Sequence, residues 1–129
     1  MGNTIWPKRL VAGNNAYATA SSGIDYTTGS VNATVDVVRY PFSSVKNPST
    51  NITITFDLSK FDSNFVSQWY FEFVPNSRTL TFSGIAVNAG LTTNNFEGGS
   101  QPSLSSSYNL FHDWTVDGIT VNIRKVIGY

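Results

Sequence analysis

The chain has 129 residues, a formal net charge of zero and a charged fraction of only 12%, about half of the roughly 25% that soluble domains usually carry. It contains 16 serines, 14 threonines and 13 asparagines, so we expect a polar but nearly uncharged surface. Without a basic cluster, the chain lacks the electrostatic attraction that drives binding to nucleic acids and to anionic membranes. We therefore expect neither as a partner, and the length corresponds to one domain.

The absence of cysteine excludes disulfides, thiolate metal sites and a cysteine nucleophile. In the first twenty residues, Pro7, Lys8 and Arg9 interrupt the apolar run that a signal peptide requires. No stretch approaches the roughly eighteen continuous apolar residues of a membrane-spanning helix. The sequence thus predicts a protein that is made in the cytoplasm without a secretion signal.

The first segment, 1–20, has apolar side chains but no regular period, and we interpret it as an N-terminal arm that precedes a domain at 21–129. Tryptophan and arginine are favoured anchors at protein interfaces. The candidate partner-binding residues are therefore Ile5, Trp6, Arg9 and Leu10, together with Tyr129 at the other end of the chain. Packing of the arm on its own domain and packing on a neighbouring subunit both stay open.

Alternation of apolar and polar residues dominates the rest of the chain. In 51–58 every even residue is apolar, which is typical of a half-buried strand, and Trp69, Phe71 and Phe73 alternate with polar residues in the same way. Further strands are expected at 16–20 and 24–27 and near Val31, Thr79, Ser107 and Ile119, which gives about eight short strands. Helical spacing occurs only in 59–66, so we expect one helical turn there at most.

A hairpin is expected around Asp117-Gly118, a dipeptide that fits a two-residue type I′ turn. Its mostly apolar face would pair Val116 with Ile119, Trp114 with Val121, His112 with Ile123 and Leu110 with Lys125. Its wettable face would pair Thr115 with Thr120, Asp113 with Asn122 and Phe111 with Arg124. A shift of one residue would place Trp114 and Ile123 on opposite sides, so burial of the apolar face is expected to hold the register.

These strands predict an all-β fold, a two-sheet antiparallel sandwich of the jelly-roll or Greek-key type, because a single sheet would leave one apolar face in water. We expect an aromatic core that consists of Phe56, Trp69, Phe71, Phe73, Phe82 and Trp114. The longest loops are expected at 43–50 and 91–107.

Catalysis is not expected, because the chain offers one histidine, two glutamates and six aspartates for acid–base chemistry. His112 and Asp113 are adjacent on a predicted strand, so they point to opposite faces and Asp113 cannot orient the imidazole. We interpret His112 as a packing residue. A single histidine, no calcium-loop pattern and no phosphate-binding glycine loop predict neither a metal nor a cofactor.

Two binding functions stay open. In a carbohydrate-binding module, aromatic rings stack on sugar faces while polar side chains bond the hydroxyl groups. The candidates are Tyr70 and Glu72 on the polar side of their strand, with Phe96 and Tyr108 as rings carried by a loop. Such a module should present coplanar exposed rings along a groove, whereas an assembly protein should bury Trp6 and its neighbours at a subunit boundary.

The signal-free start at Met1, the absence of cysteine, the Ser/Thr/Asn-rich surface, the arm around Trp6 and the β-sandwich together resemble small bacteriophage virion proteins of the head-decoration (cement) or tail-attachment type. The likeness spans the chain but includes no diagnostic motif, so it transfers no functional residue. It implies a non-enzymatic role on a capsid or similar particle, with virion proteins as partners, a virion location and a homo-oligomeric state. Glycan binding is the alternative function.

Overall fold

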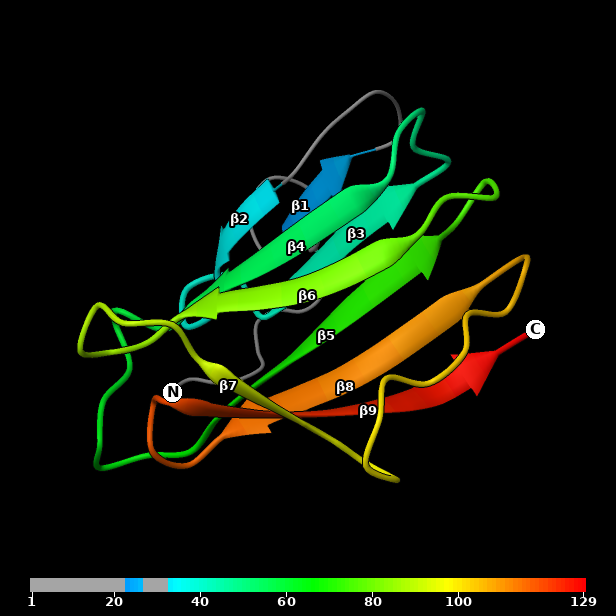
Figure 1. Ribbon diagram of the computed structural model, residues 1–129. Helices are drawn as coiled ribbons and strands as arrows, with labels where there is room; N and C mark the ends of the chain where they lie inside the picture. The colour runs from blue at the N-terminus through cyan, green and yellow to red at the C-terminus, as the bar shows by residue number, and fades with distance from the viewer. Residues whose placement is uncertain (1–22, 27–32) are drawn as a thin grey trace.

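The computed structural model describes residues 23–26 and 33–129, and in these residues nine β-strands form two sheets without a helix (Figure 1). The strands are β1 (Gly23–Tyr26), β2 (Ala33–Asp36), β3 (Phe42–Lys46), β4 (Ile52–Asp57), β5 (Ser67–Val74), β6 (Leu80–Ile85), β7 (Thr93–Phe96), β8 (Asn109–Thr115) and β9 (Thr120–Gly128). The predicted all-β sandwich is confirmed. The segment 59–66 contains turns, closed by hydrogen bonds from Phe61 N to Leu58 O and from Phe65 N to Asp62 O.

The chain passes back and forth between the two sheets. One sheet has the strand order β1-β3-β5-β8-β9-β7, and the other has the order β2-β4-β6. Five of the seven strand pairs are parallel, and only β5–β8 and β8–β9 are antiparallel. The antiparallel prediction is therefore wrong for most pairs, and a jelly-roll or Greek-key topology is not confirmed. Alternation of apolar and polar residues indicates which side chains are buried but not the direction of the neighbouring strand. The sequence pattern therefore could not distinguish parallel from antiparallel pairing.

Two predicted loops contain strands. The stretch 43–50 includes most of β3, and the stretch 91–107 includes β7, which pairs with β9. The rest of the second stretch is fastened to both sheets: Gln101 Nε2 donates to Leu80 O (2.9 Å) at the edge of β6, and Lys125 Nζ on β9 donates to Ser103 O (2.7 Å). Asn94 Nδ2 donates to Phe82 O (3.1 Å), so this bond and the one from Gln101 occupy two carbonyl groups of the edge strand β6.

The core between the sheets is aromatic, as predicted. Five of the six expected aromatic residues are buried, and Trp69 packs edge-on against Phe56 with ring centroids 5.3 Å apart. The largest fully buried side chains are Trp69, Phe56, Phe71, Phe73, Phe111, Ile54, Leu58 and Ile123. Trp114, the sixth expected core aromatic, is not among the buried residues, and Phe111 takes its place.

The β8–β9 hairpin is shifted by one residue from the predicted register, and this shift explains why Phe111 is buried in place of Trp114. Trp114 pairs with Asn122, and Asp113 pairs with Ile123, so Phe111, Asp113 and Thr115 face the core. The predicted register, with Trp114 inside, is wrong.

The turn of the hairpin is wider than the two-residue turn that the sequence suggested, because residues 116–119 connect the strands. Asp117 Oδ1 accepts hydrogen bonds from the backbone of Ile119 (2.8 Å) and Thr120 (2.7 Å), and Thr115 Oγ1 accepts one from Gly118 N (2.9 Å). These side-chain bonds satisfy the backbone of the wider turn, and Gly118 supplies the positive φ of 75° that it requires.

Candidate functional site

The partner-binding candidates Ile5, Trp6, Arg9 and Leu10 lie outside the residues that the structure describes. Tyr129 is described and is 70% exposed. Its backbone exchanges hydrogen bonds with that of Tyr108, and the two rings stack with centroids 5.4 Å apart. Tyr129 is therefore accessible, but Tyr108 covers one face of its ring.

Glu72 is the centre of a polar network on the outer face of the six-stranded sheet, the face that points away from β2, β4 and β6. Glu72 Oε2 accepts a hydrogen bond from the Tyr108 hydroxyl (2.6 Å), and Oε1 accepts one from Ser44 Oγ (2.7 Å). Lys46 Nζ lies 3.3 Å from Oε1 and forms an ion pair with it. Both carboxylate oxygens are thus engaged within the protein, which leaves Glu72 little capacity to bind the hydroxyl groups of a sugar.

The pKa values of this network follow from the same contacts. Burial raises the pKa of Glu72, but the hydrogen bonds from Tyr108 and Ser44 and the charge of Lys46 outweigh this effect, so the net pKa is lowered. Burial and the adjacent Glu72 carboxylate raise the pKa of Tyr108. Glu72 is therefore a carboxylate and Tyr108 a neutral donor at neutral pH, which is the pairing that holds the network together.

Phe96 was expected as a ring carried by a loop, whereas it lies at the end of β7 and points toward the core. Its ring packs against Phe82 with centroids 5.9 Å apart, and the residue is partly buried against the core cluster. Phe96 therefore packs between β7 and β6 at the margin of the core and does not present a free ring face.

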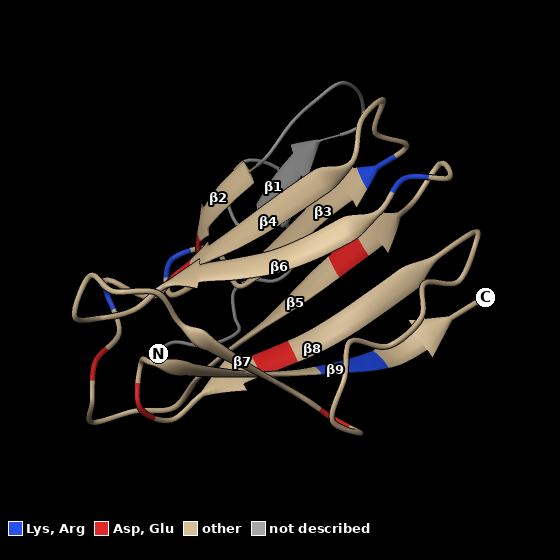
Figure 2. Ribbon diagram, in the orientation of Figure 1, with Lys and Arg blue, Asp and Glu red and all other residues tan. Residues whose placement is uncertain are grey.

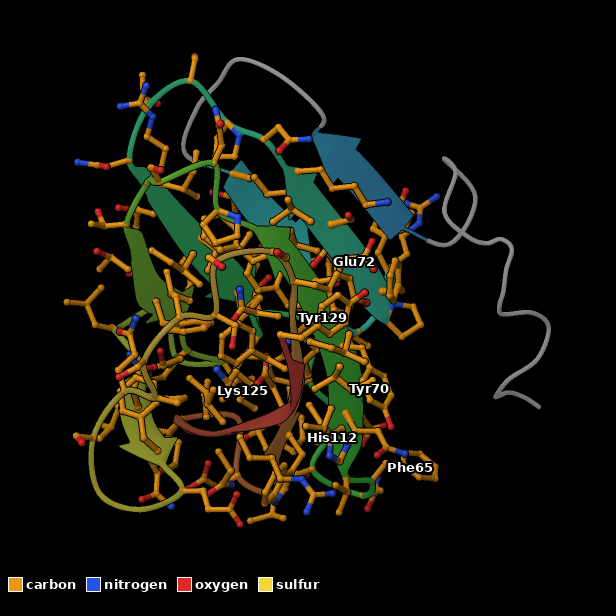
Figure 3. The ribbon with its side chains drawn as sticks, turned by 90° about the vertical axis from the view of Figure 1, so that its right-hand side faces the viewer. Phe65, Tyr70, Glu72, His112, Lys125 and Tyr129 are labelled. Atoms are coloured by element: carbon orange, nitrogen blue, oxygen red, sulfur yellow. The ribbon has the colours of Figure 1, made fainter. Side chains whose placement is uncertain are left out.

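Tyr70 lies in a row of side chains on the outer face that the sequence did not predict. Tyr70 stacks on His112 (4.8 Å between centroids), His112 stacks on Trp114 (5.3 Å), and the guanidinium of Arg124 lies 5.7 Å from the Trp114 ring centre. His112 Nε2 also lies 2.9 Å from Gln68 Oε1. Figure 3 shows Tyr70 and His112 side by side on this face. We call Gln68, Tyr70, His112, Trp114 and Arg124 the outer-face ladder.

The rings of the ladder cover one another. The planes of Tyr70 and His112 are inclined by 25°, and those of His112 and Trp114 by 28°, so each pair stacks face to face. The coplanar, side-by-side rings that we expected of a carbohydrate-binding module are not the arrangement seen here. Burial and the positive charge of Arg124 lower the pKa of His112, so its ring is neutral at neutral pH and stacks without carrying a charge.

Asp113 occupies the opposite, inner face of β8 and is fully buried. Burial raises its pKa well above the ordinary value, and the indole N–H of Trp69 opposes this shift. Trp69 lies directly across the strand pair, yet neither its Nε1 nor either Asp113 oxygen reaches hydrogen-bonding geometry with a partner. Asp113 and His112 face opposite sides of the sheet, so they do not form a catalytic pair.

One end of the sandwich carries exposed apolar side chains. Residues Phe65, Val66, Val87, Leu91, Val116 and Ile119 are all at least 40% exposed, and Leu91 reaches 81%. The loops that carry them converge: Val87 N donates to Gly118 O (2.9 Å), and Ser67, which follows Val66, pairs with Thr115. Figure 1 shows these loops at the left end of the molecule. We call the six residues the apolar end.

Charged positions are sparse along the strands and are found mainly in loops and near strand ends (Figure 2). Among the described residues, no group of three or more histidine, aspartate and glutamate side chains could hold a metal ion. No helix within 23–26 and 33–129 has the length and apolar character needed to cross a membrane. Comparison of the chain with protein-family models, with curated proteins and with solved structures gives no match.

Proposed function

We propose that this protein is a non-enzymatic structural protein that docks on a virion capsid or a comparable particle, with virion subunits and further copies of itself as partners. The observation that supports the proposal is the apolar end. Phe65 and Leu91 are 69% and 81% exposed, and four further aliphatic side chains at the same end are each at least 40% exposed. Exposed apolar clusters mark protein interfaces, because burial of such a surface is favourable when a partner covers it.

The second part of the proposal is the N-terminal arm, whose apolar and basic residues lie outside the described part of the chain. Tryptophan and arginine are favoured anchors at protein interfaces. We assign the arm residues, with Trp6 as the principal anchor, and the apolar end to one docking surface.

The molar mass of the protein in solution, measured by sedimentation or light scattering, tests the proposal. We expect dimers or trimers that dissociate when Trp6→Ala or the pair Leu91→Ser and Val116→Ser is introduced. Val126→Ser is the matched control, since Val126 is equally apolar and 42% exposed but lies near the far end of β9. A wild-type protein that stays monomeric over the whole accessible concentration range would contradict the proposal.

A further inference from the structure

Arg124 on the outer face lacks the partners that an arginine usually has. Its guanidinium carries five N–H donors, yet it forms no hydrogen bond or ion pair with a described residue and lies over the Trp114 ring. Arg124 Nε is buried without a hydrogen-bond acceptor. The one ion pair among the described residues joins Lys46 to Glu72, so no described carboxylate lies within ion-pair distance of Arg124. A half-buried guanidinium with unused donors is a site for an anion.

The strand register surrounds this cation with groups that can bond hydroxyls. Arg124 pairs with His112, and His112 pairs with Tyr70, so these three side chains form one row across the sheet. In the next row Trp114 has Gln68 on one side and Asn122 on the other. Gln68 Nε2 and the Tyr70 hydroxyl make no hydrogen bond to a described residue, because the Gln68–His112 contact uses Gln68 Oε1.

The stacking of the rings decides which kind of sugar fits. A neutral sugar is held chiefly by open aromatic faces. In the outer-face ladder His112 stacks against both Tyr70 and Trp114, and Arg124 lies over Trp114, so Tyr70 is the one ladder ring with a single ring contact. The free energy of binding must therefore come from the charge of Arg124 and from hydrogen bonds at the ring edges. A planar carboxylate matches the guanidinium fork with two parallel hydrogen bonds.

From this arrangement we propose that the outer-face ladder binds a saccharide whose terminal sugar carries a carboxylate, such as a sialic or uronic acid. The carboxylate bonds Arg124, and the sugar hydroxyls bond Gln68 and Tyr70. The ladder adjoins the apolar end, since Gln68 and Trp114 lie two residues from Val66 and Val116, but it uses different side chains. The proposal goes beyond the assembly function, and either function can fail without the other.

Glu97 is the acidic neighbour that opposes this binding. It follows Phe96, which pairs with Ile123, and its backbone N–H donates to Ile123 O (3.0 Å), so Glu97 comes next to Arg124 in the parallel register. The period of two places Glu97 on the same face as Asn95, which bonds Asn122. Glu97 is exposed and forms no ion pair with Arg124. Its negative charge repels an acidic ligand and so lowers the affinity of the site, but its carboxylate does not pair with the guanidinium.

The test is isothermal titration calorimetry at low ionic strength with two acidic ligands and their neutral counterparts. The first pair is 3′-sialyllactose and lactose, and the second is a hyaluronan tetrasaccharide and the fully N-acetylated chitotetraose. We expect at least one acidic ligand to bind about tenfold or more tightly than its counterpart, as charge-assisted hydrogen bonds imply. The pair that shows the difference identifies whether the carboxylate belongs to a sialic or a uronic acid.

Variants separate the site from general attraction to a charge. Arg124→Gln should reduce the affinity about tenfold or more, whereas Glu97→Gln should increase it about twofold. The matched control is Arg78→Gln, because Arg78 is an exposed arginine in the turn after β5, at the opposite end of that strand from Gln68 and Tyr70. Thermal unfolding of each variant verifies the fold. Equal affinity for acidic and neutral sugars, the absence of any binding, or equal losses in Arg124→Gln and Arg78→Gln would each overturn the proposal.

Discussion

The inner and outer faces of the six-stranded sheet each carry one tryptophan and one carboxyl group from the central strands β5 and β8, and the two faces treat these groups in opposite ways. On the inner face, Trp69 is well packed, whereas Asp113 is buried without a hydrogen-bond partner. On the outer face, Glu72 is bonded through both oxygens, whereas Trp114 is only partly buried. The inner face favours apolar surface and disfavours charge, whereas the outer face satisfies a charge through hydrogen bonds and leaves the stacked tryptophan partly exposed to water.

The two tryptophans give the largest expected contrast. Trp69→Ala removes a fully buried ring and should lower the free energy of unfolding by about 3–5 kcal/mol. Trp114→Ala removes stacking contacts on a wetted face and should cost about 1 kcal/mol or less. Urea unfolding monitored by circular dichroism measures both values. Similar losses in the two variants would mean that Trp114 is also buried and that the observed register of β8 is wrong.

The two carboxyl groups should respond in opposite directions to removal of the charge. Asp113→Leu replaces an unpartnered buried carboxyl with an apolar side chain of similar size, and should raise the free energy of unfolding at pH 7 by about 1–3 kcal/mol. Asp113→Asn is the control, because it removes the charge but leaves a buried polar group. A Leu variant that is less stable than the wild type would show that Asp113 has a partner in solution.

Asp113 also predicts a pH profile. Its pKa is raised in the folded state, so the folded protein holds this proton more tightly than the unfolded chain does. Its contribution to stability is present in full below the unfolded pKa and is lost as the pH rises toward the folded pKa, with a slope of at most about 1.4 kcal/mol per pH unit. Unfolding free energies measured from pH 4 upward should fall in the wild type. Under the same conditions, the unfolding free energy of Asp113→Leu should not show this fall with rising pH.

Glu72 has the opposite pH dependence and the smallest effect. Its pKa is lowered in the folded state, so its contribution is present above the unfolded pKa and is lost as the pH falls through the folded pKa. Glu72→Gln keeps the size of the side chain but weakens the bonds to Tyr108, Ser44 and Lys46, and should cost about 1 kcal/mol at pH 7. The same unfolding assay tests this value. Above about pH 5, Glu72→Gln should leave the downward slope caused by Asp113 unchanged.

Much of the strand content could be predicted because β4 and β5 have only one apolar phase. Ile52, Ile54 and Phe56 are buried and their polar neighbours are not, as the alternation requires. The same holds for Trp69 and Phe71 in β5. If such a strand turned its other face to the core, several large apolar side chains would be exposed to water. Burial therefore determines which face points inward.

The binding candidates were harder to predict because β8 has two phases that could both be buried. One contains Leu110, His112 and Trp114, and the other contains Phe111 with Asp113 and Thr115. Hydrophobicity favours the first phase, but the fold buries the second. The hydrogen-bonding capacity of Asp117 and Thr115 was the one local signal for the wider turn, and that turn moves Trp114 and Arg124 to a common outer surface.

The amino-acid sequence by itself determined the all-β class, the aromatic core and the low surface charge, because these depend on composition and on the alternation of side chains along single strands. Only the tertiary structure decided the parallel direction of most strands, the register of β8 and the gathering of apolar side chains at one end. These features depend on which strands become neighbours and on how the turns between them are bonded, and such contacts join residues that are distant in the sequence.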